Sequence, residues 1–407
     1  MSASPLIPNL PYRRVGYATG LLTETGFTST IFEEMSVLST AYSAINLGQG
    51  FPDTDGPQQI FDASMRAMKD GINQYVPIAG HSKLRAAIAA HQERFYGQKV
   101  DEESEVLVTA GASEALAASI AAFVNPGDEV IVFEPYYDIY PAAVALAGGK
   151  LMTVPLLPPT FAPDIDQLEA AFSDRVALVI LNDPHNPTGT VFPAEIKQKI
   201  VDLAIKHDAI ILQDGVYEHI TFGEDFDPVF NLEGATERTL FVSAISKTHS
   251  LTGWRVGWVV GPESLITPLK LVKGYFSHSA AAPLQIGAAT GLNLPSSFYS
   301  DLVRQYAEQK NILMQGLAGT GLQLSDPAGT FFIAADATAL LEAKGIADAQ
   351  ELAEILPEQA GVTVVPMAAF TTADFAPELK NWIRFAFCKK PAVLHNAVEK
   401  LREWVKA

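Results

Sequence analysis

Hydrophobic residues between positions 104 and 261 form short uninterrupted runs, and amphipathic helical patterns separate several of these runs. The runs are VLVTA (106–110), EVIVFEP (129–135), LMTVPL (151–156), VALVILN (176–182) and AIILQD (209–214). Two further apolar runs, at 240–242 and 258–261, lie on either side of a turn of small and hydroxyl residues. Buried strands joined by helical crossovers are typical of a mostly parallel sheet sandwiched by helices. The pattern therefore predicts a large α/β domain.

The two ends of the chain have different patterns. After about residue 294 we expect a long helix (299–317), strands within 322–326, 329–336, 361–365 and 382–387, and helices around Glu351 and Val398. At the other end, Pro5, Pro8 and Pro11 predict an extended start, and 31–42 has helical spacing. We thus predict an N-terminal arm and first helix joining the small domain (1–50), a large domain (51–295) and a small α+β domain (296–407).

Composition excludes several classes of protein. The 407 residues are 48% hydrophobic and 18% charged, which suits two globular domains. Acidic residues outnumber basic ones by 46 to 28, so phosphate backbones should repel the chain and we expect no nucleic acid partner. The longest apolar stretch, 115–124, is about half a membrane span, so we expect no membrane partner. With one cysteine, Cys388, and no export signal in residues 1–14, a cytoplasmic location is expected.

Candidate functional residues follow the predicted strands. Ligands of parallel sheets bind beyond the carboxyl ends of the strands. Gly111, Ala112 and Ser113 come between a strand and a helix, where free amide groups and the helix dipole favour an anion. Arg255 would be its second contact. The alternative is an ordinary helix N-terminus capped by Ser113, and neither a Walker loop nor a GxGxxG motif is present.

Three more strand ends carry polar groups. Asn186, in the turn NPTG, either shapes a tight loop or donates its amide to a ligand. Asp214 ends a strand, and either caps a turn or pairs with a protonated ring nitrogen that Tyr217 also contacts. Lys247 lies in the turn between the last two runs of the large domain. In a dry cavity its pKa would fall and it would form a Schiff base, whereas a surface lysine would pair with an acid.

The remaining candidates are an arginine, a glycine turn and a tyrosine. Arg384, among the aromatic residues of WIRFAF, either extends to water from an edge strand or presents a fork to a carboxylate. Gly48 and Gly50 bracket a turn whose backbone a ligand can approach closely. Tyr75 precedes Val76-Pro77 in a loop and by itself indicates only packing. We expect no metal among these site residues.

Taken together, these motifs are specific in their order. Five features follow one another along the chain: a glycine turn, NPTG, Asp-x-x-Tyr, Ser-Lys followed after eight residues by Arg, and a late Arg in an apolar strand. In this order they resemble the class I/II aminotransferases of fold type I. These enzymes depend on pyridoxal 5′-phosphate (PLP), and the resemblance covers nearly the whole chain. Within that family, the chain resembles most the branch of kynurenine/glutamine, methionine and N-succinyldiaminopimelate aminotransferases. The motifs that carry this resemblance are IFEEMS, NLGQGFPD, EPYYDIY, PHNPTG and GWRVGW.

The resemblance implies roles for individual residues. Lys247 would form the internal aldimine, Asp214 would hold the pyridine nitrogen protonated, and Asn186 and Tyr217 would reach the ring hydroxyl. The remaining contacts would be Gly111, Ala112, Ser113, Ser246 and Arg255 for the phosphate, Tyr137 stacking on the ring, Tyr75 reaching the partner subunit's phosphate, and Arg384 with Gly50 and Asn186 for the substrate carboxylate. Ala244 departs from a serine common in relatives, and Ser243 or Ser246 would replace it. The implied assembly is a homodimer with shared active sites.

The implied reaction moves an amino group from an L-amino acid to a 2-oxo acid through pyridoxamine phosphate. We expect an aromatic pocket formed by Tyr17, Phe27, Phe51, Tyr137 and Phe332. Such a pocket favours a broad range of amino donors: aromatic or sulfur-containing amino acids, or glutamine. N-succinyldiaminopimelate stays open, with Lys270, Lys273 or His278 for a distal carboxylate. The alternatives are a cysteine-S-conjugate C–S β-lyase on the same scaffold and a non-catalytic PLP-binding effector module. The module would need a DNA-binding domain, for which residues 1–46 leave no room.

Overall fold

The computed structural model describes residues 10–223 and 226–407, so Pro5 and Pro8 lie outside the described residues. Pro11 does not keep the chain extended as predicted, because it begins helix α1 (Pro11–Ala18). Proline is tolerated at this first helical position, where no backbone N–H is needed and its fixed φ suits a helix. Helix α1 packs on α6 (Ile139–Ala147), where Arg14 donates to the carbonyl oxygens of Ala145 and Leu146.

The predicted large sheet is present and has seven strands in the order β4-β10-β9-β8-β7-β5-β6. Their bounds are β4 (Val106–Thr109), β5 (Glu129–Glu134), β6 (Lys150–Pro155), β7 (Val176–Asn182), β8 (Ile210–Asp214), β9 (Thr239–Ala244) and β10 (Gly257–Val260). Strand β10 runs in the direction opposite to that of the other six strands, antiparallel to both β4 and β9. The link from β9 to β10 contains only the short helices α9 (Ile245–Thr248) and η3 (Thr252–Trp254). A parallel return needs a longer crossover, so the strand turns back instead.

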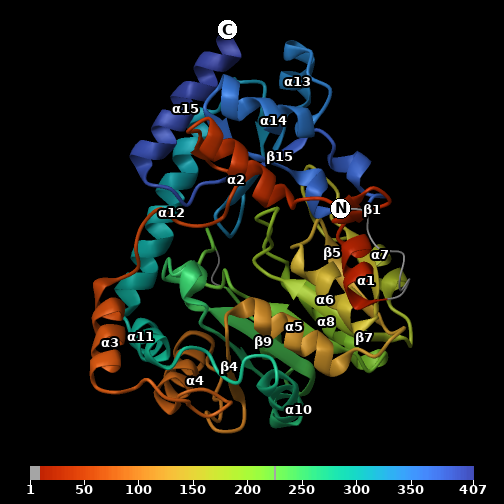
Figure 1. Ribbon diagram of the computed structural model, residues 1–407. Coiled ribbons are helices and arrows are strands. Elements are labelled where there is room, and N and C mark those ends of the chain that lie inside the picture. The colour runs from red at the N-terminus through yellow and green to blue at the C-terminus, as the bar shows by residue number, and fades with distance from the viewer. Residues whose placement is uncertain (1–9, 224–225) are drawn as a thin grey trace.

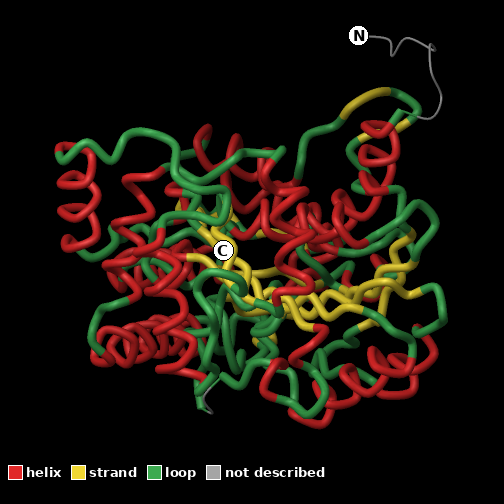
Figure 2. The backbone as a smooth tube through the Cα atoms, turned by 90° about the horizontal axis from the view of Figure 1, so that it is seen from below, coloured by secondary structure: helices red, strands yellow, loops and turns green. Residues whose placement is uncertain are grey.

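Helices cover both faces of this sheet (Figure 2). Successive strand residues alternate between the two layers: Leu178 and Ile180 of β7 belong to the core beneath α5 (Ala112–Phe123), while Val179 and Leu181 belong to the core beneath α8 (Ala194–Lys206). This alternation is why the strands read as uninterrupted apolar runs. The other helices of this half are α3 (Gln58–Lys69), α4 (Ser82–Tyr96), α7 (Ile165–Ala171), α10 (Glu263–Gly274) and α11 (Ala282–Leu292).

A second, antiparallel sheet has the order β11-β12-β15-β14 and lies above the first in Figure 1. Its strands are β11 (Gln323–Leu324), β12 (Phe332–Asp336), β14 (Val365–Pro366) and β15 (Trp382–Ala386), and its helices are α12 (Ser296–Gly316), α13 (Thr338–Lys344), α14 (Ala349–Gln359) and α15 (Pro391–Lys406). The long helix α12 leads into this part from the large sheet.

The N-terminal segment contacts both parts of the molecule. A hairpin of β1 (Leu22–Thr23) and β2 (Gly26–Phe27) follows α1. Helix α2 (Ile31–Ala41) packs on α14, and β3 (Ile45–Asn46) pairs in parallel with β13 (Val362–Thr363). We propose to keep the domain boundaries near residues 50 and 295 on the basis of these pairings. Among the described residues, no helix is both long enough and apolar enough to span a bilayer.

Candidate active site

A cavity of about 150 Å³ opens where the carboxyl ends of the large sheet's strands meet the second sheet. Most of the predicted site residues line it: Gly50, Ala112, Ser113, Tyr137, Asn186, Asp214, Tyr217, Ser246, Lys247, Arg255 and Arg384. They come from strands, loops and one helix start spread over the whole chain. The parallel topology brings them together because it places consecutive strand ends at one edge.

Asp214 is the last residue of β8 and is 3% exposed. Its Oδ2 accepts a hydrogen bond of 2.7 Å from the Tyr140 hydroxyl, whereas its Oδ1 is buried without a partner among the described residues. Burial raises the pKa of this carboxyl to about 6. A carboxylate at this depth gains most from a cationic donor aimed at its free oxygen.

Lys247 lies in the short helix α9 between β9 and β10, as the turn of small residues predicted. Its Nζ donates to the carbonyl oxygen of Gly50 at 3.1 Å and lies 5.7 Å from the centre of the Tyr217 ring. Burial lowers the pKa of the amine to about 8. A substantial fraction of such a lysine is neutral near physiological pH, which is the form that acts as a nucleophile or base.

The groups of the predicted anion site lie together at the start of α5. Arg255, with φ 53°, turns its guanidinium back to donate to the Ser113 hydroxyl at 3.3 Å and to the carbonyl oxygen of Thr252 at 3.1 Å. Gly111 has φ 80°, and a Cβ there would lie 2.4 Å from an Arg255 nitrogen. Glycine is therefore required for the arginine to cross the helix start. Ser113 does not cap α5, whose N-cap residue is Gly111, so the capping alternative is wrong.

Arg384 lies in β15 and is 1% exposed, so it does not extend to water. It donates to Oδ1 of Asn186 at 2.9 Å and to the carbonyl oxygen of Gly48 at 2.7 Å, and its Nε has no partner in residues 10–223 and 226–407. Its guanidinium carbon lies 4.0 Å from the centre of the Phe332 ring and 4.7 Å from that of Phe370. Burial lowers its pKa to about 10, which still leaves it cationic. A buried arginine bonded only to neutral groups is suited to an incoming carboxylate.

The sequence interpretation missed several residues of this cavity: Phe32, Leu116, Asn182, Val216 and Thr252 line it, and Tyr140 supports it from behind. Asn182 accepts from the backbone N–H of Asn186 and donates to the carbonyl oxygen of Asp214, so it joins two predicted residues. Asn182 stands in the run VALVILN and Tyr140 in the motif EPYYDIY. The polar side chain of Asn182 at the end of β7 was an available signal, whereas Tyr140 lies in α6 and its contact with Asp214 depends on how that helix packs.

Other predicted residues lie elsewhere. Tyr75 is 89% exposed and outside the cavity. Of the five aromatic pocket residues, Tyr137 and Phe332 line the cavity, whereas Tyr17, Phe27 and Phe51 are exposed outside it. Lys273 is fully buried and donates to the carbonyl oxygens of Ile78 and His278, so it is not presented to a distal carboxylate. Ser243 donates to Glu218 and does not line the cavity, whereas Ser246 lines it together with Ser113, Thr252 and Arg255.

Known proteins resemble this chain closely. Residues 42–401 match the family described as aminotransferase class I and II. A probable N-succinyldiaminopimelate aminotransferase from Mycobacterium tuberculosis is 39% identical over 92% of this chain and 96% of its own length. Methionine aminotransferase from Escherichia coli is 36% identical over 99% and 100%, and kynurenine–oxoglutarate transaminase from Dictyostelium discoideum is 34% identical over 93% and 94%.

Solved structures agree with these matches. The crystal structure of the Escherichia coli enzyme superposes with a TM-score of 0.89 over 98% of this chain and 100% of its own, and the Mycobacterium tuberculosis N-succinyldiaminopimelate aminotransferase with 0.88 over 93% and 97%. The predicted fold type I architecture and the predicted branch are thus confirmed. The chain belongs to the class I and II aminotransferases, and it is a PLP-dependent aminotransferase.

Proposed function

We propose that transamination takes place in the cavity described above and that Lys247, Asp214 and Arg384 carry it out. One observation carries the proposal: a lysine with a lowered pKa, a buried carboxylate with a free oxygen and a buried arginine that forms no ion pair within the described part of the chain all face one cavity. These residues fit PLP. The free Oδ1 of Asp214 suits a protonated pyridine nitrogen, and the α5 start with Arg255 suits the phosphate.

Each residue then has a defined task. When bound, PLP supplies an electron sink for the charge left on the substrate's Cα after deprotonation. Asp214, fixed by Tyr140, would hold the protonated pyridine nitrogen, and Tyr217 and Asn186 would hold the ring hydroxyl. Arg384 binds the substrate carboxylate in a forked contact and so fixes the direction of the Cα–H bond. The neutral Lys247 amine would accept the proton from the substrate Cα as a base and give it up again as an acid.

The donor that we propose is broad: an aromatic or sulfur-containing amino acid, glutamine or N-succinyldiaminopimelate. Phe32, Tyr137 and Phe332 give the cavity aromatic walls beside Arg384, which supports the first two classes. The relatives that act on methionine, kynurenine and N-succinyldiaminopimelate support the wider range.

We also propose a homodimer with shared active sites. Tyr75 lies against His278, with ring centres 5.2 Å apart, on a surface that exposes further apolar side chains: Ile78, Leu271, Tyr275 and Phe276. A patch of this kind is characteristic of an interface. In the dimer, Tyr75 reaches the phosphate of the partner's cofactor. The cytoplasmic location remains a prediction that depends on the single cysteine, Cys388.

A half-reaction panel tests this proposal. The PLP-loaded enzyme is mixed in turn with methionine, glutamine, kynurenine, glutamate, N-succinyldiaminopimelate and a cysteine S-conjugate, and cofactor absorbance, keto acid, pyruvate and ammonia are measured. We expect loss of the PLP absorbance with an equal amount of keto acid. Pyruvate and ammonia with the absorbance restored would identify the β-lyase instead. No change with any donor would contradict the role of Arg384.

A further inference from the structure

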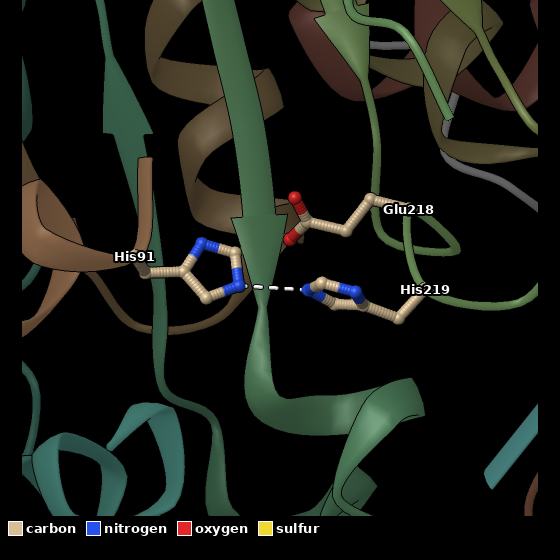
Figure 3. A group of neighbouring side chains, drawn as sticks. All are labelled: His91, Glu218 and His219. Atoms are coloured by element: carbon tan, nitrogen blue, oxygen red, sulfur yellow. Dashed lines mark hydrogen bonds between the residues drawn. The ribbon is translucent and has the colours of Figure 1, made fainter. Parts of the chain in front are cut away.

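Three potential metal ligands converge on one another beside the turn that carries Tyr217. Figure 3 shows their three side chains. His91 comes from α4, and Glu218 and His219 directly follow Tyr217. One ligand atom from each lies within 4.8 Å of the other two, and the Nε2 atoms of the two histidines are 2.7 Å apart. We call these three residues the His–Glu–His cluster. It lies outside the active-site cavity, and no sequence motif joins residues 91 and 219.

Glu218 has no cation to balance its charge. It is 4% exposed, and among the described residues no lysine or arginine lies within ion-pair distance of it. Its two oxygens accept hydrogen bonds from the hydroxyls of Tyr96 and Ser243. These hydroxyls orient the carboxylate but bring no charge. Buried carboxylates are otherwise paired with a cation, bound to a metal or protonated.

The geometry of the two histidines suits metal binding. Their Nε2 atoms lie 2.7 Å apart, and a hydrogen bond between two ring nitrogens requires one of them to be unprotonated. A neutral imidazole offers a lone pair to a cation. The second nitrogen of His91, Nδ1, is buried without a partner among the described residues, so it can carry the ring proton when Nε2 binds an ion; the hydrogen bond between the two Nε2 atoms is then replaced by two bonds to the metal.

We propose that the His–Glu–His cluster binds one Zn²⁺ ion. Two imidazole nitrogens and one carboxylate oxygen are a known zinc ligand set. Zinc–nitrogen bonds of about 2.0–2.1 Å in a tetrahedron require the Nε2 atoms to be about 3.3 Å apart. The two rings therefore separate by about 0.6 Å, and each imidazole carries its proton on Nδ1. His219 is half-buried, and a water molecule would be the fourth ligand of the tetrahedron.

The ion has a structural effect on the active site. It joins α4 to the turn in which Glu218 donates from its backbone N–H to the carbonyl oxygen of Gly215 and Ile220 donates to that of Tyr217. Zinc binding thereby fixes the backbone that positions the Tyr217 ring over the cavity. The cluster does not line the active-site cavity. A failure of the zinc proposal would therefore leave the proposed transamination unaffected, and a failure of the proposed transamination would leave the zinc proposal unaffected.

Metal analysis of the intact PLP-loaded enzyme tests the site. The protein is produced in zinc-supplemented medium without a histidine tag, purified without chelators, and analysed by plasma mass spectrometry. We expect about one zinc per chain. X-ray absorption should show two imidazoles and oxygen at about 2.0–2.1 Å. In a chelator-treated sample, zinc should raise the melting temperature.

Variants locate the ion. His91→Asn and Glu218→Gln should each lose the zinc, whereas His207→Asn should keep it. His207 is the matched control because its Nδ1 faces Asp174 at 3.0 Å on the surface, so it would account for adventitious binding by a histidine–carboxylate pair. If a cluster variant does not fold, Co²⁺ replaces Zn²⁺ in the wild type, and a tetrahedral visible spectrum is expected. Wild-type enzyme without stoichiometric zinc or cobalt, or zinc that persists in both cluster variants, overturns the proposal.

Discussion

Two buried carboxylates on one short segment, Asp214 and Glu218, have contrasting surroundings. Each accepts a hydrogen bond from a tyrosine hydroxyl, Tyr140 for Asp214 and Tyr96 for Glu218. Burial raises the pKa of Asp214 to about 6 and that of Glu218 to about 7. Asp214, however, keeps one oxygen free toward the cavity, whereas both oxygens of Glu218 are occupied by hydroxyls on the opposite side of the turn.

The difference teaches how one segment serves two purposes. A carboxylate with a free oxygen facing a cavity is prepared for a ligand that comes and goes, such as a cofactor. A carboxylate enclosed by hydroxyls and neutral histidines is prepared for a contact that stays, such as a structural ion. Substitutions on the cavity side should therefore change turnover, and substitutions on the buried side should change stability.

The largest effect is expected from Lys247→Ala. The amine is the proposed carrier of the Cα proton, so turnover should fall by up to about 10⁴-fold without it. PLP should still bind, because Asp214 and Arg255 are unchanged. Borohydride treatment followed by peptide mass mapping should fix the cofactor to residue 247 in the wild type only. A variant with near-normal turnover would remove Lys247 from the mechanism.

Asp214→Asn should have the next largest effect. The amide keeps the shape of the side chain but cannot hold a positive charge on the pyridine nitrogen. The rate of the half-reaction should fall by about 10²–10³-fold, as for loss of other preorganised electrostatic groups. Stopped-flow absorbance with the best donor measures this rate, and PLP content serves as the control. A fall of less than tenfold at full PLP content would be inconsistent with the proposed pairing.

Arg384→Lys should weaken substrate positioning. Lysine retains the charge but loses the fork that contacts Asn186 and Gly48 and would hold a carboxylate at two points. Loss of one charged hydrogen bond costs about 1.5–3 kcal/mol, or about 10–100-fold in kcat/KM. The corresponding amine without a carboxylate should react equally slowly with both enzymes. If the loss of kcat/KM is the same for that amine, Arg384 does not bind the carboxylate.

The fold and most of the cavity could be predicted from the sequence because parallel strands impose a common geometry. Buried apolar runs placed Asp214, Asn186 and Lys247 at one edge without knowledge of distances. Contacts between segments of unrelated spacing could not be predicted this way. Tyr140 meets Asp214, and His91 meets His219, only because helices pack on particular strands. Pro11 was misread because proline suits both an extended segment and the first turn of a helix.

Cofactor binding should depend on pH through Asp214. Its pKa in the cofactor-free protein is about 6, above the value of 3.8 for an ordinary aspartate, because burial disfavours the anion. Proton uptake therefore stabilises the cofactor-free fold below about pH 3.8, and this stabilisation is lost as pH rises through 6. PLP needs the anion, so its dissociation constant should rise by up to about tenfold per unit below pH 6. Titration by fluorescence measures it, and Asp214→Asn should abolish the slope.

The smallest effects come from the matched pair Tyr140→Phe and Tyr96→Phe, which remove one hydroxyl from each carboxylate. Tyr140→Phe should lower the half-reaction rate by about tenfold, because Asp214 loses the bond that aims its free oxygen. Tyr96→Phe should leave that rate within about twofold and lower the free energy of unfolding by about 1–3 kcal/mol, because Glu218 loses a buried hydrogen bond. Stopped-flow and urea unfolding measure the two quantities. Equal losses of rate in the two variants would mean that both carboxylates act on the cavity.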